Sequence, residues 1–183
     1  WGAQLVQGSV PGDYRATTSA ALPVLYTGPT GLVDAEKLCE NTVSNYHFTQ
    51  PAALVSTVNG TTYTLSAFLK QGERRYAGIH LNDGTARGCS IDLQTGTLGT
   101  PYGGATATVQ SLGSGWYRLS ITATVTAATN QPAFYASDTN ALNIYTGDGS
   151  SGIYISRAML DYGSTAGAYL DNATASAYYA PRF

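Results

Sequence analysis

Apolar and polar residues alternate with a period of two along several segments, which is the pattern of half-buried β-strands. Residues 116–125 give the clearest case, since one face of that strand would carry Tyr117, Leu119, Ile121, Ala123 and Val125. The same alternation predicts further strands at residues 62–70, 76–82, 105–109, 132–137 and 153–160. Residues 34–40 are the one candidate helix, of one or two turns, and fit a strand equally well.

Short turn-forming sequences separate the predicted strands. They are Asn59-Gly60, Asp83-Gly84, Thr95-Gly96, Gly103-Gly104, Gly113-Ser114-Gly115 and Gly147-Asp148-Gly149. Gly, Asn and Asp tolerate the backbone conformations that tight turns require. Many short strands joined by Gly-rich turns are typical of a sandwich or barrel, so the sequence predicts an all-β domain.

The composition agrees with this prediction. The 183 residues suffice for one domain with a real core, and they include 21 Gly and 14 Tyr. Charged residues make up 11% of the chain, whereas about 25% is usual. A surface so poor in charge and rich in hydroxyl groups suits a component of a particle or a protein that binds glycans.

The charge pattern argues against two classes of partner. The net charge is −2, and the densest basic spot, Arg74-Arg75, lies beside Glu73. Nucleic-acid binding needs a basic stripe, so we do not expect it. No apolar stretch approaches the roughly 20 residues of a membrane span, so we expect no membrane partner. Because the sequence begins at Trp1 without a signal peptide, we expect a fragment of a longer protein.

Cys39 and Cys89 are the only cysteines. Cys89 alternates with Ile91 and Leu93, and this pattern predicts a buried thiol. A disulfide between the two cysteines stays open, although a secreted disulfide scaffold would carry more of them. Neither histidine stands at a usual metal-ligand spacing from a cysteine, so zinc is not expected.

The chain contains an internal echo at a constant offset of 155. Residues 1–20 share seven identities with residues 156–175, including an A-x-L-x-x-G-S core. A fixed period of this length indicates whole domains in tandem. We therefore expect residues 1–21 to be a trailing strand of a preceding repeat or an N-terminal strand. Residues 22–177 would form the complete module, and residues 178–183 a linker to a following segment.

Several segments resemble, in the same order, the motifs of repeat domains in bacteriophage tail and tail-fibre proteins, a family often described as minor structural proteins. They are AEKLCEN at 35–41, TYTLSAFLK at 62–70, IDLQTGT at 91–97, GSGWYRLS at 113–120, YTGDGSSGIYI at 145–155 and APRF at 180–183. Residues 1–9, WGAQLVQGS, match the motif that follows the fifth segment, and residues 156–164 carry a degraded copy. The resemblance spans nearly the whole chain.

The resemblance implies a jelly-roll β-sandwich of two antiparallel sheets, similar to carbohydrate-binding modules and concanavalin-like lectins. It implies a place in the phage virion, with assembly in the bacterial cytoplasm and action outside the cell. The implied partners are other tail proteins, tandem repeats or a homotrimer, and a polysaccharide of the host surface. It carries over no agreed binding residues.

We do not expect the chain to be an enzyme. A glycoside hydrolase needs two carboxylates facing each other across a cleft, about 5–10 Å apart. The chain has only 11 Asp and Glu, and Asp83, Asp138 and Asp148 stand in turns. Asp92 fits an outward position on a strand, but no second strand offers a partner carboxylate. No Ser or Cys nucleophile motif accompanies either histidine.

Two groups of residues suit a glycan, which needs an aromatic plane ringed by polar side chains. One group lies on or beside the strand at 76–82 and comprises Arg74, Tyr76, His80 and Asn82. The other lies near the end of the strand at 132–137 and comprises Tyr135, Asn140, Asn143 and Tyr145. An equally favoured interpretation is that these tyrosines are half-buried and covered by a loop or a neighbouring subunit. Trp116, in its G-x-G-W-Y-R setting, is expected to brace a loop.

Asp148 is the one candidate ligand for a structural Ca²⁺, which carbohydrate-binding jelly rolls often hold. One carboxylate is weak evidence, because Ca²⁺ takes six to eight oxygens, and a tight turn is the better interpretation. No other cofactor is expected. Three functions therefore stand as hypotheses: a non-catalytic tail module that binds host carbohydrate, a spacer or oligomerisation module of the tail, and a carbohydrate-binding module excised from a glycan-degrading phage enzyme.

Overall fold

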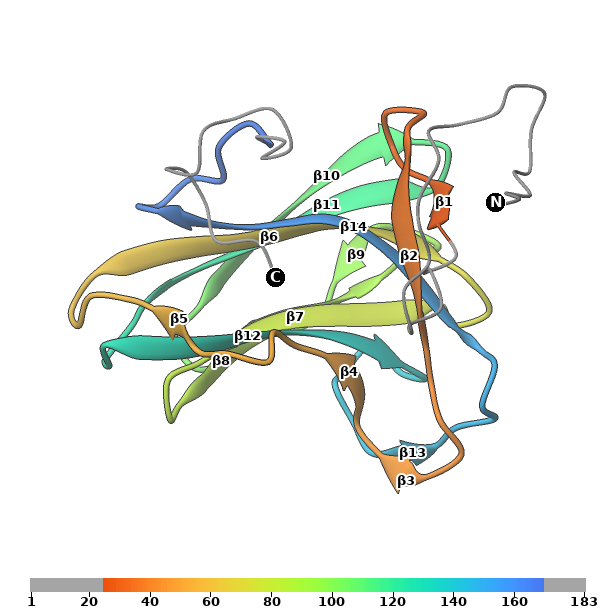
Figure 1. Ribbon diagram of the computed structural model, residues 1–183, viewed down its shortest axis with the longest axis horizontal. Helices are drawn as coiled ribbons and strands as arrows, with labels where there is room; N and C mark the ends of the chain where they lie inside the picture. Colours follow the sequence, from red (N-terminus) through yellow and green to blue (C-terminus); the bar gives the residue numbers. More distant parts are fainter. Residues whose placement is uncertain (1–24, 170–183) are drawn as a thin grey trace, which may run out of the picture.

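The predicted strands form two antiparallel sheets packed face to face in the computed structural model, which describes residues 25–169 (Figure 1). Sheet 1 has the order β1 (Leu25–Thr27), β2 (Val33–Cys39), β14 (Gly152–Tyr162), β6 (Thr62–Gln71), β11 (Trp116–Thr124) and β10 (Thr106–Gly113). Sheet 2 has the order β4 (His47–Thr49), β12 (Thr129–Ser137), β7 (Tyr76–Asn82), β8 (Ala86–Asp92) and β9 (Thr97–Leu98), with β5 (Val55–Ser56) beside β12.

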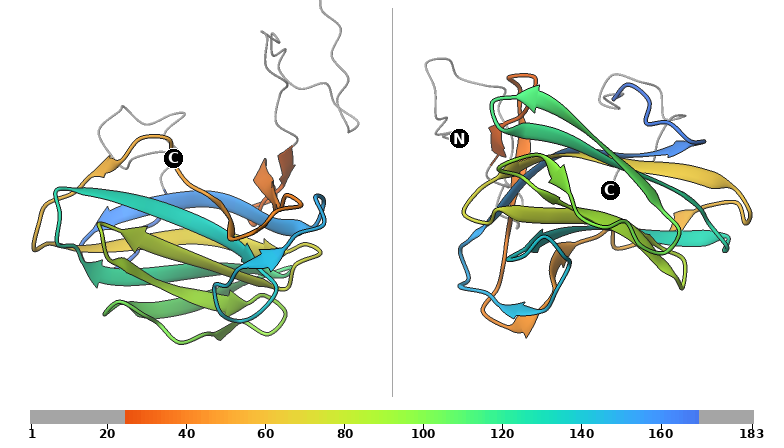
Figure 2. Two further views of the ribbon diagram at one scale, coloured as in Figure 1. Left: turned by 90° about the horizontal axis from the view of Figure 1, so that it is seen from below. Right: turned by 180° about the vertical axis from the view of Figure 1, so that it is seen from behind.

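The two layers are also visible from the two further sides in Figure 2. A two-stranded ribbon of β3 (Ser44–Asn45) and β13 (Tyr145–Thr146) projects from the sandwich at the bottom of Figure 1. The described residues contain no helix, and so none that could cross a membrane. This arrangement confirms the expected all-β, jelly-roll-like sandwich.

The core lies between the sheets and is made by the faces that the alternation predicts. On β11, Leu119 and Ile121 are fully buried, and β7 contributes Ala77, Ile79 and Leu81. The other large members of this core are Tyr63, Leu65, Leu69, Cys89, Ile91, Leu93, Val125, Phe134, Ile153 and Leu160. Burial of apolar side chains is the main favourable contribution to folding, so this interior fixes the register of every central strand.

Two segments differ from the sequence prediction or extend it. Residues 33–39 form strand β2 rather than a helix, because they pair with β1 and with β14 and bury Ala35 completely. Strand β8 was not assigned from the sequence, although the alternation of Cys89 and Ile91 is part of it. The apolar alternation is short in β8, because Arg87 takes the inward position opposite Leu81 and only Cys89 and Ile91 follow it within the strand.

A smaller apolar cluster lies on the outer face of sheet 1. Phe68 and Trp116 pack there against Ala35, and Trp116 is only 3% exposed. The Lys70 ammonium lies 6.0 Å from the centroid of the Trp116 ring. Trp116 therefore faces away from the Leu119 row and is held by packing.

The cysteines are both free. Cys39 is exposed and Cys89 is buried, which confirms the prediction for Cys89 and leaves no disulfide between them. The proposed strand at residues 1–21 and the linker at 178–183 lie outside the described residues. Of the second copy of the echo, residues 156–169 fall within them, in the last part of β14 and the residues that follow it.

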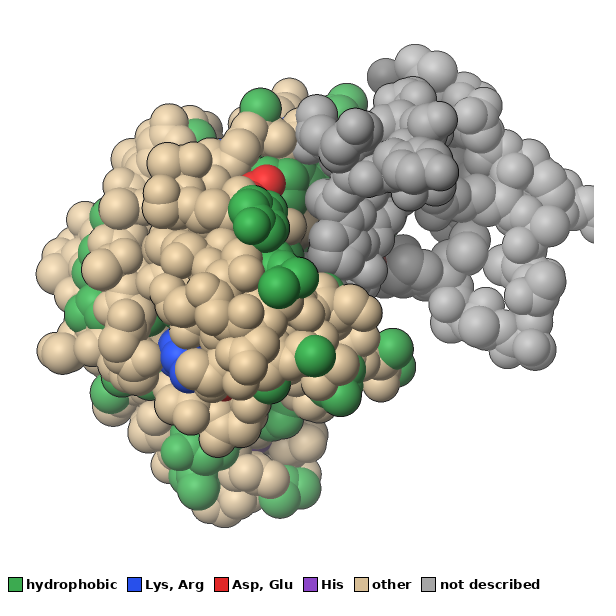
Figure 3. Space-filling model, turned by 90° about the vertical axis from the view of Figure 1, so that its left-hand side faces the viewer, with side chains coloured by type: hydrophobic (Ala, Val, Ile, Leu, Met, Phe, Trp, Pro, Cys, Tyr) green, Lys and Arg blue, Asp and Glu red, His purple; other side chains and the backbone are tan. Residues whose placement is uncertain are grey.

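Few charged side chains reach the surface at the end of the molecule that faces the viewer in Figure 3. Small areas of Lys or Arg and of Asp or Glu stand in a surface of backbone and uncharged polar groups, with scattered hydrophobic side chains. The sequence composition predicts such a surface.

Candidate functional site

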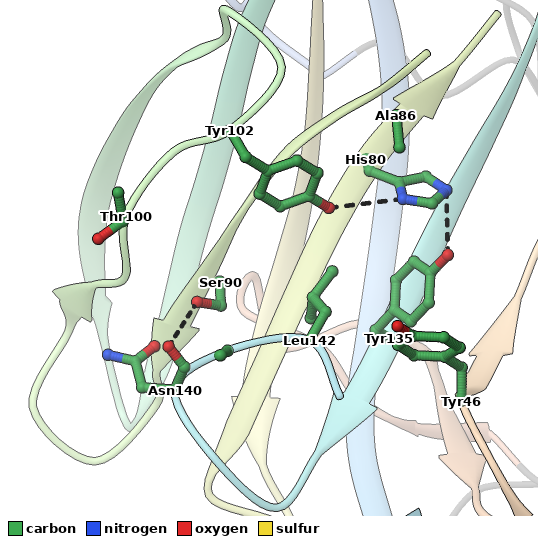
Figure 4. A pocket seen from close by; sticks show the side chains of 10 residues that line it. Tyr46, His80, Ala86, Ser90, Thr100, Tyr102, Tyr135, Asn140 and Leu142 are labelled. Carbon is green, nitrogen blue, oxygen red and sulfur yellow. Dashed lines mark hydrogen bonds between the residues drawn. The ribbon is translucent and has the colours of Figure 1, made fainter. Parts of the chain in front are cut away.

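A pocket of about 520 Å³ lies on the outer face of sheet 2 (Figure 4). Strands β7, β8 and β12 form its floor, and the loops at residues 99–105 and 138–144 form its walls. Its lining consists of Tyr46, His80, Ala86, Ser90, Thr100, Tyr102, Tyr135, Asn140, Ala141 and Leu142. Pockets of this size hold small organic ligands.

Two glycines in neighbouring strands create this hollow. Gly78 on β7 and Gly88 on β8 both present the outer face of the sheet, where neither has a side chain. A Cβ at Gly78 would lie 2.5 Å from Leu142 Cδ2, and a Cβ at Gly88 would lie 2.5 Å from Tyr102 Oη. The missing side chains therefore let the two loops rest directly on the sheet, as glycines inside strands often do.

His80 and two tyrosine hydroxyls form the polar centre of the pocket. The Tyr135 hydroxyl lies 3.0 Å from His80 Nε2, and the Tyr102 hydroxyl lies 3.5 Å from Nδ1. His80 stands on β7 and Tyr135 on the adjacent β12, whereas Tyr102 is held over β8 by backbone hydrogen bonds with Gly88. Figure 4 shows the imidazole between the two phenol groups.

Burial sets the protonation of these groups. Desolvation lowers the pKa of His80 to about 4, so the imidazole is neutral at neutral pH. Desolvation also raises the pKa of Tyr135 to about 12 and raises that of Tyr102, so both phenols keep their protons. The centre of the pocket is therefore uncharged, and its groups act only as hydrogen-bond donors and acceptors.

Aromatic rings continue from this centre towards solvent. Tyr46 and Phe48 flank Tyr135, with ring centroids 6.1 and 5.2 Å from the Tyr135 ring. Phe48 lies opposite Tyr135 in the pairing of β4 with β12. Tyr46 is 42% exposed and Phe48 is 41% exposed, so both offer open ring surface beside the pocket.

The opposite wall carries a polar group without a partner. Ser90 Oγ donates a hydrogen bond of 3.0 Å to the backbone carbonyl of Asn140, which fixes this loop on β8. The side-chain Oδ1 of Asn140 is buried and has no hydrogen-bond partner among the described residues. A buried acceptor of this kind costs free energy until a donor reaches it.

The structure brings together some of the residues that the sequence predicts for a glycan site. His80, Tyr135 and Asn140 all line the pocket. Tyr76, at the start of β7, instead stacks under Arg75. Asn82, at the other end of β7, accepts a hydrogen bond from the Gly84 backbone in a turn.

Asn143 and the pair Arg74–Tyr145 also lie outside the pocket lining. The Asn143 side chain accepts hydrogen bonds from Ser137 and Thr139 and so stabilises its own loop. The Arg74 guanidinium stacks on the Tyr145 ring at 5.2 Å, and both side chains bind the buried Glu40 carboxylate. This group, the Glu40 network, joins the end of β2 to β13.

Three aromatic contributors to the site were not predicted: Tyr46, Phe48 and Tyr102. Tyr46 and Phe48 stand two residues apart in the sequence, which is the spacing of one strand face. Tyr102 is marked only by Gly103-Gly104 beside it. The glycines inside strands β7 and β8 were a further signal, because such glycines indicate close approach of another group.

The residues around Asp148 do not fit a calcium ion. Asp148 Oδ1 accepts hydrogen bonds from the backbone of Ser150 and Ser151, and Oδ2 accepts one from the Ser151 hydroxyl. These bonds lower the pKa of Asp148. The Arg74 guanidinium lies 3.8 Å from its carboxylate, where it would repel a cation. Within residues 25–169, no three His, Cys, Asp or Glu side chains gather as a metal site.

The pocket contains no pair of groups set up for hydrolysis. Asp and Glu are missing from its lining. Both His80 nitrogens face tyrosine hydroxyls, and Ser90 donates to a backbone carbonyl. The arrangement can stack on a flat apolar ligand surface and exchange hydrogen bonds with hydroxyl groups.

Comparison of the sequence with protein-family models finds no match, and comparison with curated proteins finds none either.

Proposed function

We propose that the chain is a non-catalytic, carbohydrate-binding module of a bacteriophage tail or tail fibre, and that the pocket on sheet 2 binds a polysaccharide of the host surface. The observation that carries the binding proposal is the aromatic row formed by Tyr46, Phe48, Tyr135, His80 and Tyr102. The assignment to a phage particle rests on the sequence motifs.

A sugar ring matches this surface chemically. Its C–H face stacks on an aromatic ring, and its hydroxyls exchange hydrogen bonds with polar side chains at the edge. Tyr46 and Phe48 supply exposed rings, and His80 with its two tyrosines supplies the polar edge. A single open pocket of this kind would bind a sugar unit weakly. Several copies of the module on one particle would bind the polysaccharide more tightly through avidity.

The test is a glycan-array screen of the folded chain, followed by calorimetry on each glycan that binds. Tyr46→Ala and Phe48→Ala should each weaken binding at least about tenfold, since each removes an exposed ring. Tyr162→Ala is the matched control, because Tyr162 is a tyrosine on sheet 1 and is 77% exposed. Binding that survives both pocket variants would refute the assignment of this face, and a folded chain that binds no host polysaccharide would refute carbohydrate binding.

The edge of sheet 1 favours a second function, self-association of the module. Edge strands β1, β4 and β9 have two or three residues each, whereas β10 has eight and carries neither charge nor proline. Its outer edge makes no backbone hydrogen bond to other described residues. Ala107 and Val109 pack against the core yet stay partly exposed there. Long, uncharged edges pair readily with another strand.

In this second function, β10 pairs with β10 of another copy and extends sheet 1 across a two-fold axis. Sedimentation analysis should show a dimer that Thr108→Lys converts to a monomer, because the exposed Thr108 lies in the middle of β10. Thr129→Lys on β12 is the matched control at another exposed threonine. A wild-type chain that stays monomeric at high concentration would exclude self-association.

A further inference from the structure

We propose that the pocket on sheet 2 selects an uncharged sugar unit and rejects acidic sugars, and that Tyr102, His80 and Tyr135 hold it through hydroxyl hydrogen bonds. This inference rests on the proposed carbohydrate binding and names the class of sugar. Two features of the pocket support it: the charge of the lining and the number of hydrogens at the polar centre.

The lining contains no side chain that is charged at neutral pH. It holds three tyrosines, one neutral histidine, small polar residues, alanines and a leucine. Two nearby arginines are already committed: Arg75, just before β7, pairs with Asp92, and Arg87 on β8 pairs with Asp83. A uronate, sialate or sulfate group in the pocket would lose hydration without gaining a cation, which is strongly unfavourable.

Counting hydrogens shows what the polar centre can offer. A neutral imidazole carries one N–H, and each phenol carries one O–H. The two bonds within Tyr102–His80–Tyr135 use two of these three hydrogens. One phenol hydrogen therefore remains for a ligand, together with the free lone pairs of both phenol oxygens. A sugar hydroxyl can accept the former and donate to the latter.

The experiment compares each neutral oligosaccharide that binds with its uronate counterpart of the same linkage, by calorimetry at neutral pH with a chelator present. The neutral sugar should bind at least about tenfold more tightly than the uronate. Its affinity should change little with salt, because no ion pair forms. Tyr102→Phe and Tyr135→Phe keep the rings and should each weaken neutral-sugar binding, whereas Tyr162→Phe on sheet 1 should not.

A variant that adds the missing cation tests the same point in the opposite direction. Ala86 is exposed at the rim of the pocket, so Ala86→Lys should gain affinity for the uronate. Uronate binding to the wild-type chain as tight as neutral-sugar binding, but lost in Tyr46→Ala, would overturn the inference and keep the proposed function. Full neutral-sugar affinity in both Phe variants would overturn it too. Failure of every sugar to bind a folded chain would overturn both proposals.

Discussion

Replacing Glu40 with alanine should destabilise the fold by about 3 kcal/mol. The Glu40 side chain is fully buried, and its carboxylate accepts four hydrogen bonds. Two come from Arg74, one comes from the Tyr145 hydroxyl at 2.7 Å, and one comes from the Asp148 backbone at 2.7 Å. Removing one partner of a buried ion pair costs about 3–5 kcal/mol. The lower end applies, because the Arg74 side chain is 25% exposed and can regain some hydration.

Thermal and denaturant unfolding measure this effect. A loss of about 3 kcal/mol lowers Tm by roughly 10 °C in a domain of this size. Glu36→Ala is the matched control, since Glu36 is an exposed residue of β2, the strand that ends just before Glu40. If Glu40→Ala and Glu36→Ala destabilise the fold equally, the Glu40 network contributes no more than a surface carboxylate, and the reasoning fails.

The same variant should change the dependence of stability on pH. Burial alone would raise the pKa of Glu40, but hydrogen bonds from Arg74, Asp148 and Tyr145 outweigh it, so the folded-state pKa lies below the ordinary value of 4.5. A carboxyl group with a lowered pKa stabilises the fold above its unfolded-state pKa and loses that contribution as the pH falls through the folded-state value. Glu40→Ala should therefore flatten the acid limb of the stability curve, which unfolding curves at a series of acidic pH values would reveal.

Three further predictions follow from individual side chains. Gly88→Ala should destabilise the fold by about 1–3 kcal/mol and weaken glycan binding, because its Cβ would lie 2.5 Å from both Ile79 O and Tyr102 Oη; unchanged Tm and affinity would contradict this. The pKa of His80 is about 4 in the folded chain and 6.5 in the unfolded chain. The neutral histidine therefore stabilises the fold fully above pH 6.5, and this contribution is lost as the pH falls towards 4. His80→Gln should abolish this part of the pH dependence of the unfolding free energy, measured by unfolding curves. A thiol reagent should modify the exposed Cys39 rapidly and the buried Cys89, whose pKa is raised by burial, only on unfolding; equal rates in the native chain would disagree.

Alternation predicted most strands because each has one face in a single apolar core. The signal was weak for β8, where Arg87 takes an inward position opposite Leu81 and only Cys89 and Ile91 give an apolar row. It was ambiguous at β2, because Ala, Glu, Lys and Leu are also good helix formers. Pairing with the neighbouring β1 and with β14, which is distant in the sequence, decided that case.

The site was only partly predictable for a related reason. Alternation places His80 on the outer face of its strand, and it groups Arg74 with His80 because they are near in sequence. Arg74 instead binds Glu40, which is 34 residues away in the sequence. Tyr145 binds the same carboxylate, 105 residues from Glu40. Tyr46 and Tyr102 reach the pocket through strand pairing and a loop crossing that one sequence does not encode locally. Short-range pattern therefore predicts β7 and β12 in the floor of the pocket, whereas its walls depend on contacts distant in sequence.

The two outer faces of the sandwich differ in what covers them, and this difference decides which face is available to a ligand. On sheet 1, residues 163–169 lie over the strands: Arg118 donates to the Gly167 carbonyl at 2.6 Å, and Tyr169 packs on the Phe68–Trp116 cluster. On sheet 2, the loops rest on Gly78 and Gly88 and leave an aromatic hollow between them. Both ends of the described chain, β1 and Tyr169, belong to the side of sheet 1. The pocket is thus on the face of the sandwich that residues 163–169 do not cover.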